Sequence, residues 1–387
     1  MDDTLRTVAS FDDVNEGIEL RLRLRIAAGR VAALEISNGR PAALLEVLRG
    51  RRADDVPALV QRLFPICGNA HALACAGAIA AARGDDVHRH GEQQRDLLWA
   101  ELAVAHGWRC LIDWPAVLGR PPQLAVLRAL MDSAGHLRAL AQTLPPANAH
   151  ARTRARNELA SALAQTVFGD NTPRALHAAA LCAWVGTQAS PLHELLGVIQ
   201  GSPLASLRQP DVTLLSMPTA SWFAARLSAN PDFGRHPSAD GMAAEVGAYA
   251  RCSSAERALF DASGPLAARL LAMLASAAAL ITRLRAAARG LLPAVVVDAC
   301  SPLPASGCAV VDTVRGPLAY WVRLEAGRIA DLRSLAPTEW MLHPRGVLYQ
   351  WLPGLPAEGA QHAARLALAA VDPCAVTAIA LEGMADA

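Results

Sequence analysis

The sequence has almost no excess of charge of either sign. Its 387 residues include 36 Lys and Arg against 35 Asp and Glu, which gives a formal net charge of +1. Proteins that bind nucleic acid usually carry a strong basic excess, so this balance argues against nucleic acid as a ligand. Charged residues make up 18% of the chain and hydrophobic residues 53%, which excludes a disordered chain and predicts a well-packed globule.

The sequence also lacks an export signal and a membrane span. It opens with the acidic stretch MDDTLRTVASFDD, which has neither the basic start nor the apolar core of a secretory signal. Its longest apolar stretch, Leu270 to Thr282, lies between Arg269 and Arg283 and is far shorter than the roughly 20 residues of a membrane helix. We therefore expect a cytoplasmic protein in which this stretch is a buried helix.

Cysteine pairs of the C-x-x-C type are absent as well. The eight cysteines are scattered, so no local motif encodes a zinc ribbon or an iron–sulfur cluster. In a reducing cytoplasm most of them are expected to be small core residues. No Gly-rich phosphate loop and no G-x-S-x-G motif occur, which leaves nucleotide-binding and hydrolase functions without support.

The spacing of apolar residues changes twice along the chain. From Glu16 to Ser37 apolar and polar residues alternate on both sides of a glycine-containing turn, which predicts an antiparallel hairpin within residues 1–39. Spacings of three and four residues then predict a helical bundle within 40–290, with helices at 53–65, 70–82, 93–106, 123–142, 152–167, 174–199 and 242–288.

Strand patterns return after Pro293, in the third part of the chain, 291–387. We expect strands at 294–297, 308–311, 319–324 and 328–333, a hairpin turn at 325–327, and closing helices at 359–371 and 374–382. Because strands lie at both ends with helices between them, the sequence predicts one intertwined α+β domain over 1–387. It should be mainly α-helical, with small antiparallel strands contributed by both ends of the chain.

Two cysteines are expected at the starts of helices. Cys67 follows a predicted turn, and Cys67 and His71 have the i, i+4 spacing that places two side chains on one helix face. Asp372 fits a helix N-cap and Pro373 the first helical position, so Cys374 falls in the first turn. The helix dipole and the free N–H groups there favour a thiolate, which binds metal ions. A cysteine in such a place is nevertheless more often a packing residue.

These two segments resemble the metal-binding motifs of the [NiFe]-hydrogenase large subunit. The first family motif is R-x-C-G-x-C-x-x-x-H. When the two sequences are aligned on the histidine of this motif, His71 matches that histidine and Cys67 matches the second cysteine. The second motif is D-P-C-x-x-C-x-x-H, whose first three positions match Asp372, Pro373 and Cys374.

Two further segments carry the same resemblance. Glu16-Gly17 matches the end of the family's R-I-E-G segment. The stretch DTVRGPLAYWVRLEAGRIADLRSLAPTEW resembles the family's P-R-G-x-L-x-H-W strand, its hairpin and its P-T-x-W segment, through Arg315, Gly316, Leu318, Trp321, Pro337, Thr338 and Trp340. The four segments occur in the family's order, which implies the large-subunit fold. In that fold the two metal motifs converge, so we expect the sulfurs of Cys67 and Cys374 within about 4 Å of each other.

The departures from the family pattern imply a different function. Phe64 stands where the first motif has its other cysteine, and Thr377 and Ala380 replace the second cysteine and the histidine of the second motif. A working large subunit uses four thiolates, of which this chain keeps a metal-bridging position, Cys67, and a nickel-only position, Cys374. Nickel needs a full set of soft donors. The resemblance therefore implies no nickel and no hydrogen cleavage, and we expect the chain not to be an enzyme.

The residues that surround the iron's diatomic ligands are kept. A metal-bound cyanide accepts hydrogen bonds and carries negative charge, so it favours a fixed guanidinium and a hydroxyl or backbone donor. The resemblance gives these roles to Arg315 and Thr338 and places Pro337 and His71 in the same cofactor site. Taken alone, Arg315 is typical of a surface ion pair and Thr338 of a helix cap. Glu16 matches the family's proton-relay glutamate and, without hydrogen turnover, is expected to serve only the hairpin.

An iron pocket kept beside missing nickel ligands resembles the HupK/HoxV family of hydrogenase-formation proteins. This resemblance implies a maturation scaffold that binds, carries or transfers an iron unit with cyanide and carbonyl ligands, Fe(CN)2(CO). The implied partners are a small maturation chaperone that carries the iron, other maturation factors and the immature hydrogenase large subunit.

Two other functions stay open at this stage. The chain also fits a metal-free structural subunit of a redox complex, and it fits less well a redox enzyme with a two-thiolate metal site. Among the other histidines, His88 and His90 have a spacing that does not converge on a helix and are expected in a solvated loop, while His106 is expected to be structural.

Overall fold

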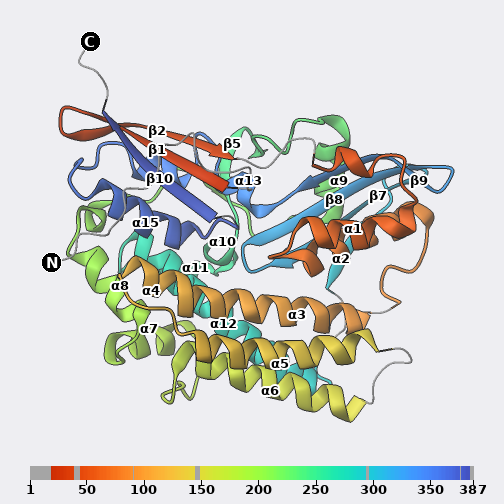
Figure 1. Cartoon of the computed structure of the whole chain (residues 1–387), viewed down its shortest axis with the longest axis horizontal. Helices are drawn as coiled ribbons and strands as arrows, with labels where there is room; N and C mark the ends of the chain where they lie inside the picture. Colours follow the sequence, from red (N-terminus) through yellow and green to blue (C-terminus); the bar gives the residue numbers. More distant parts are fainter. Residues whose placement is uncertain are drawn as a thin grey trace, which may run out of the picture.

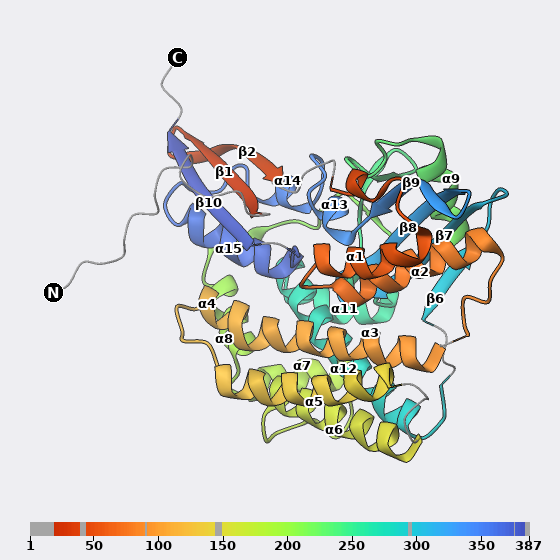
Figure 2. The ribbon, with the colours of Figure 1, turned by 45° about the vertical axis from the view of Figure 1, so that its right-hand side comes forward.

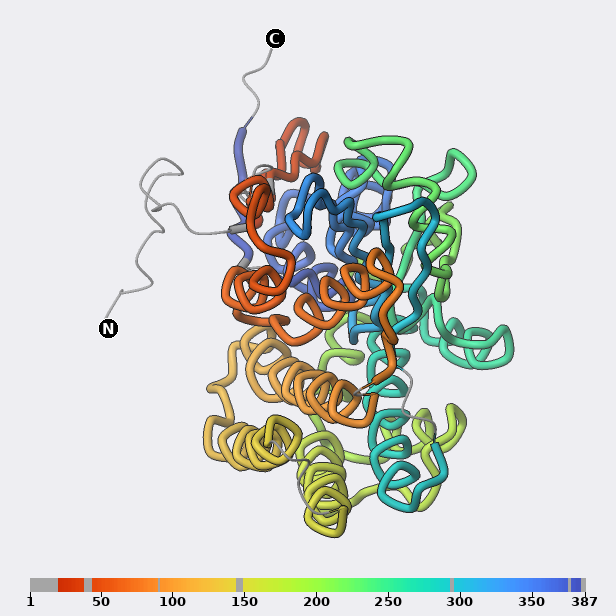
Figure 3. The backbone as a smooth tube through the Cα atoms, turned by 90° about the vertical axis from the view of Figure 1, so that its right-hand side faces the viewer, coloured from red at the N-terminus to blue at the C-terminus, as the bar shows by residue number. Residues whose placement is uncertain are grey.

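The computed structural model describes residues 19–38, 44–89, 91–143, 149–292, 296–374 and 376–383. A helical bundle forms one layer, and the sheets with their covering helices form the other (Figure 1). The described residues form three sheets, of which the smallest has the strand order β3-β5-β4, formed by Thr213–Leu214, Met242–Glu245 and Ser238–Ala239. The view in Figure 3 shows the bundle stacked beneath the sheet layer. Glu16 lies outside the described residues, as does His90.

The first sheet joins the two ends of the chain. Strands β1 (Glu19–Ala27) and β2 (Arg30–Asn38) form the predicted antiparallel hairpin, and β10 (Val376–Gly383) pairs parallel with the other edge of β1. Figure 2 shows β10 lying beside this hairpin. Leu20, Leu22 and Leu24 of β1 are fully buried, which gives the sheet its inner face.

The helix expected at 374–382 is therefore wrong, because most of this segment is strand β10. In the sequence VTAIALEG the larger side chains of Ile379 and Leu381 alternate with alanines, and alanine fits either state. Pairing with β1, which lies at the other end of the sequence, decides between the two.

The second sheet is antiparallel and confirms the strands predicted at 308–311, 319–324 and 328–333. Its order is β6 (Val297–Cys300), β7 (Ser306–Thr313), β8 (Gly316–Glu325) and β9 (Arg328–Leu335). The strand predicted at 294–297 lies partly outside the described residues, and β6 begins only at its last position. The predicted turn joins β8 to β9, with φ of +48° at Ala326 and +73° at Gly327, as a two-residue hairpin turn requires. Helix α2 (Gly68–Arg83) packs on β7 and β8. Gly307 permits this close contact, because a Cβ there would lie 2.0 Å from the carbonyl oxygen of Ala78.

The bundle contains α3 (Gly91–Trp108), α5 (Leu124–Gln142), α6 (Ala149–Phe168) and α12 (Pro265–Ala288). Helix α12 contains the apolar stretch that we expected to be a buried helix. Its 24 residues match a membrane span in length and composition. Inside the protein, 78% of its most apolar window is buried, as in a core helix.

Shorter elements complete the fold and correct two predicted helices. Residues 174–199 form two helices, α7 (Ala178–Thr187) and α8 (Pro191–Gln200), because Ser190 caps a new start before Pro191. Residues 242–288 begin with β5 (Met242–Glu245), α10 (Ala248–Arg251) and α11 (Ser254–Asp261) ahead of α12. The other α-helices and strands are α1 (Val56–Leu63), α4 (Trp114–Val117), β3 (Thr213–Leu214), α9 (Ala220–Ala229), β4 (Ser238–Ala239), α13 (Pro337–Met341), α14 (Val347–Trp351) and α15 (Ala360–Val371).

Candidate functional site

The two cysteines of the predicted site lie side by side. Cys67 is the N-cap residue of α2, as expected, but its side chain caps no N–H group of the helix. Cys374 lies in the short segment between α15 and β10. Their Sγ atoms are 3.7 Å apart although 307 positions separate them in the sequence, so the predicted distance is confirmed. Both sulfurs are therefore within reach of one metal ion.

One pocket contains both thiols and the other predicted cofactor-binding residues. It is formed by the start of α2, by α3, by the turn into β8 and by the start of α13. Its lining residues are Ile66, Cys67, His71, Glu101, Leu102, Ala105, Thr313, Val314, Arg315, Leu318, Ala336, Pro337, Thr338 and Cys374. Apart from Glu16, the structure thus brings all the predicted site residues together.

Arg315 is a pocket residue and not a surface ion-pair residue. Its side chain is 13% exposed, and it donates from Nε to the backbone oxygen of Asp372 at 3.0 Å and from Nη2 to the Asp372 carboxylate at 3.3 Å. Burial alone would lower the pKa of Arg315, but Asp372 and the two thiols hold it above its usual value. Within the described part of the chain Nη1 donates no hydrogen bond, so it stays available to a ligand.

Thr338 does not cap α13, whose N-cap is Ala336. Its hydroxyl oxygen instead accepts a hydrogen bond from the backbone N–H of Cys374 at 3.4 Å. Because the oxygen acts as the acceptor, the hydroxyl hydrogen is free to point to a pocket ligand. Thr338 therefore fixes the position of Cys374 and adds a donor to the pocket.

His71 is buried and held by two aromatic residues. Its Nδ1 lies 2.8 Å from the hydroxyl of Tyr320, and the ring of Phe64 stacks on the imidazole with centroids 3.7 Å apart. Phe64, which stands where the family motif has a cysteine, is thus a packing partner of His71. Thr377, at the other lost cysteine position, lies in β10 opposite Leu20 of β1.

Asp372 is the C-cap of α15 and not the predicted helix N-cap. Its backbone is left-handed, with φ of +57°, a conformation that is strained for a residue other than glycine. Its buried carboxylate pairs with two arginines, Arg315 and Arg109. These ion pairs stabilise the left-handed turn of the backbone at Asp372, two residues before Cys374.

Arg109 was missed in the sequence analysis. It opens the π-turn Arg109–Asp113 that continues α3, and its Nη1 lies 3.3 Å from Nδ1 of His106. Burial and the nearby Arg109 hold the pKa of His106 well below its ordinary value, so this histidine is neutral and accepts from the guanidinium. Burial also raises the pKa of Asp113 to about 6. The available sequence signal was the presence of two charged residues, Arg109 and Asp113, in the otherwise largely apolar stretch HGWRCLID.

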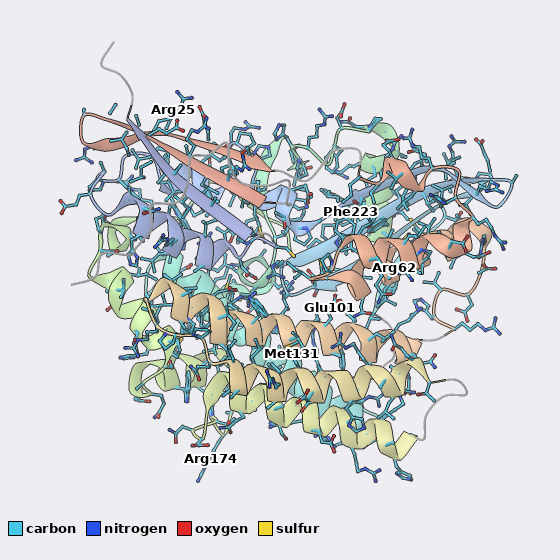
Figure 4. The ribbon with its side chains drawn as sticks, in the orientation of Figure 1. Arg25, Arg62, Glu101, Met131, Arg174 and Phe223 are labelled. Atoms are coloured by element: carbon cyan, nitrogen blue, oxygen red, sulfur yellow. The ribbon has the colours of Figure 1, made fainter. Side chains whose placement is uncertain are left out.

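Glu101 was missed as well. It comes from α3, and Figure 4 shows it between the bundle and the layer above it. Its carboxylate accepts from the backbone N–H of Asn69 at 2.7 Å and of Ala70 at 3.1 Å, at the start of α2. Burial raises its pKa to about 7 although both bonds lower it. A lone glutamate in the apolar stretch LLWAELAVA was the available sign.

The thiol of Cys67 is protonated at neutral pH. Its contact with Cys374 raises its pKa well above the ordinary value, and burial adds to this. A metal ion that binds here must therefore displace protons from the sulfurs. In the described residues no group of three or more His, Cys, Asp or Glu side chains is arranged to hold a metal ion.

The chain matches known proteins along nearly its whole length, although no protein-family model matches it. It is 30% identical over 381 residues to the hydrogenase expression/formation protein HupK of Rhizobium leguminosarum bv. viciae, with 94% of this chain and 96% of that protein covered. The chain belongs to the HupK/HoxV family of hydrogenase expression/formation proteins. A second member, HoxV of Cupriavidus necator, is 29% identical, with 93% and 96% covered.

Solved hydrogenase structures share the fold of this HupK/HoxV family member. The [NiFeSe] hydrogenase of Desulfovibrio vulgaris Hildenborough superposes with a TM-score of 0.53 at 16% identity, covering 90% of this chain and 94% of that chain. An NAD+-reducing [NiFe]-hydrogenase gives a TM-score of 0.54 at 16% identity, covering 89% and 93%. The predicted α+β large-subunit fold is therefore confirmed, while the roles of the pocket residues stay predictions.

Proposed function

We propose that this hydrogenase formation protein holds an Fe(CN)2(CO) unit as cargo between Cys67 and Cys374 during assembly of a [NiFe]-hydrogenase active site. The observation that carries the proposal is the 3.7 Å separation of the two sulfurs inside one pocket. Two thiols this close share one iron once both lose their protons to solvent or neighbouring groups.

The donor set fits an iron that brings its own ligands. An isolated metal ion needs more donors than two thiolates, and the described residues offer no third ligand beside them. In the proposed cargo, cyanide and carbonyl occupy the positions that protein ligands would otherwise take. Two thiolates then suffice, and the lack of further protein ligands disfavours a bare metal ion.

The other pocket residues suit the diatomic ligands. Arg315 has an uncommitted Nη1 and Thr338 an uncommitted hydroxyl hydrogen, and both are donors of the kind that a bound cyanide accepts. Leu102, Ala105 and Leu318 supply an apolar wall against which a carbonyl ligand fits. Pro337 of α13 and His71 of α2 complete the lining of the pocket.

The remaining parts of the proposal follow from the same residues. Phe64 and Thr377 supply no thiolate for nickel, so we expect no nickel and no hydrogen cleavage. A cargo carrier must receive the iron unit and pass it on. Its proposed partners in the cytoplasm are accordingly a small iron-carrying maturation chaperone, other maturation factors and the immature large subunit.

Infrared spectroscopy of protein purified anaerobically with its maturation partners tests the cargo directly. Cyanide and carbonyl bands are expected in the wild type and should disappear in Cys67→Ser and in Cys374→Ser. Cys182→Ser is the matched control, because this cysteine lies in α7, outside the pocket, and its variant should keep the bands. A folded wild type without these bands after loading would refute the cargo and favour a metal-free structural subunit.

A further inference from the structure

We propose that α3, with the π-turn that continues it, sets the distance between the two thiols by binding the segment of Cys67 through Glu101 and the segment of Cys374 through Arg109. Both are positioning residues, since neither is a proposed iron ligand. This inference rests on the proposed function only for the reason why the distance between the two sulfurs matters, which is the binding of one iron. The contacts themselves join two cysteine segments to one rigid element.

Glu101 replaces the cap that Cys67 does not provide. The first N–H groups of a helix have no partner inside it and are usually satisfied by the side chain of the N-cap residue. Cys67 is the N-cap of α2 but makes no such bond. The carboxylate of Glu101 accepts from two of these groups, at 2.7 and 3.1 Å, and so leaves the sulfur of Cys67 directed to other partners.

Arg109 acts on the other segment through Asp372. Left-handed backbone at an aspartate costs on the order of 1 kcal/mol or more and persists only when its surroundings hold it. Arg109 binds the carboxylate of Asp372 from the bundle side, while Arg315 binds its carboxylate and its backbone oxygen from the sheet side. The turn that leads to Cys374 is therefore fixed to both layers of the protein.

Glu101 and Arg109 lie far enough apart along α3 and the π-turn that continues it for this one element to reach both segments. Glu101 and Arg109 are eight positions apart, which corresponds to about 12 Å along an α-helix. A π-turn inserts an extra residue, changes the direction of the side chains that follow it and often occurs at functional sites. Here it begins at Arg109 itself, and neutral His106 supports the guanidinium from the preceding turn.

The disulfide equilibrium of the two thiols measures their spacing without iron. In iron-free protein, glutathione disulfide takes two electrons and two protons from Cys67 and Cys374, giving one protein disulfide and two glutathione molecules. Mass spectrometry after alkylation gives the linked fraction at each redox ratio, and hence the effective concentration of one thiol at the other. Loss of one charge-assisted bond at either anchor should lower this value about tenfold or more.

We expect this decrease in Glu101→Ala and in Arg109→Ala, with partial recovery in Glu101→Gln and Arg109→Lys. The conservative variants also serve if the alanine variants fail to fold. Arg156→Ala is the control, because it removes a buried arginine from another carboxylate, Asp96 in the bundle, and should lower stability without changing the equilibrium.

An effective concentration unchanged in folded Glu101 and Arg109 variants would overturn the role of α3, whatever the infrared spectra show. An equal decrease in Arg156→Ala would also overturn it, since general loosening would then be the cause. Missing cyanide bands in the wild type would contradict the iron cargo alone. The two proposals thus fail by different measurements.

Discussion

Replacement of Arg315 separates a ligand-binding arginine from a merely structural one. If its free Nη1 donates to a bound cyanide, Arg315→Ala removes a charge-assisted bond of about 1.5–3 kcal/mol. That energy corresponds to a ten- to hundredfold loss of iron occupancy at fixed loading conditions. The substitution also takes one of two arginines from Asp372, so we expect a loss of about 2–3 kcal/mol in the free energy of unfolding.

The chain offers a matched control for this second effect. Asp96 is held in the bundle by Arg152 and Arg156 much as Asp372 is held by Arg109 and Arg315. Arg156→Ala should therefore cost similar stability and leave the pocket intact. Arg315→Lys keeps the charge but loses the planar fork, so it should restore the cyanide bands only in part and shift them.

The measurement is the intensity of the cyanide bands per folded molecule, with folding followed by urea denaturation. Strong bands in Arg156→Ala beside weak or absent bands in Arg315→Ala are expected. Full-strength bands in folded Arg315→Ala would refute the assigned role. So would equal losses in both variants.

Three further substitutions test other parts of the structure. Replacing Phe64 and Thr377 together by cysteine should give measurable nickel binding in equilibrium dialysis, and continued exclusion would show that missing donors are not decisive. Glu101 keeps its proton in the folded state up to a pKa of about 7, above the ordinary 4.5, so the wild type should lose up to about 3 kcal/mol of stability relative to Glu101→Gln as pH rises from 5 to 8. Parallel stability curves for the two proteins would contradict this argument. Gly307→Ala should cost about 1–3 kcal/mol, because its Cβ would lie 2.0 Å from a carbonyl oxygen of α2; Gly135→Ala in α5, where nothing lies within 4 Å, should not destabilise the protein.

Local patterns were enough to predict much of the fold. The hairpin of β1 and β2 and the turn at 325–327 follow from alternation and turn residues, which act over a few positions. Residues 242–245 and 376–382 were predicted to be helical, and their alanines are compatible with both states. Pairing with strands that are distant in the sequence selects the strand conformation of such segments. The local spacing of apolar residues carries no information about those distant strands.

The site residues that stand at positions of the family motifs could be predicted from the sequence. Cys67, Arg315, Thr338 and Cys374 stand at motif positions, and the structure brings them into one pocket. Glu101 and Arg109 act through a backbone N–H pair and through a carboxylate on other elements. Nothing in the residues beside them in the sequence shows those contacts, which depend on how α3 lies between the two layers.

The parallel pairing of β10 with β1 determines when the pocket exists during protein synthesis. Cys67 leaves the ribosome early, whereas Cys374 and β10 follow near the end of the described chain. Segments made first fold first, and the contact that closes the pocket spans most of the sequence. A nascent or prematurely terminated chain therefore contains only one of the two pocket thiols, and the pair forms after Cys374 and β10 have been made.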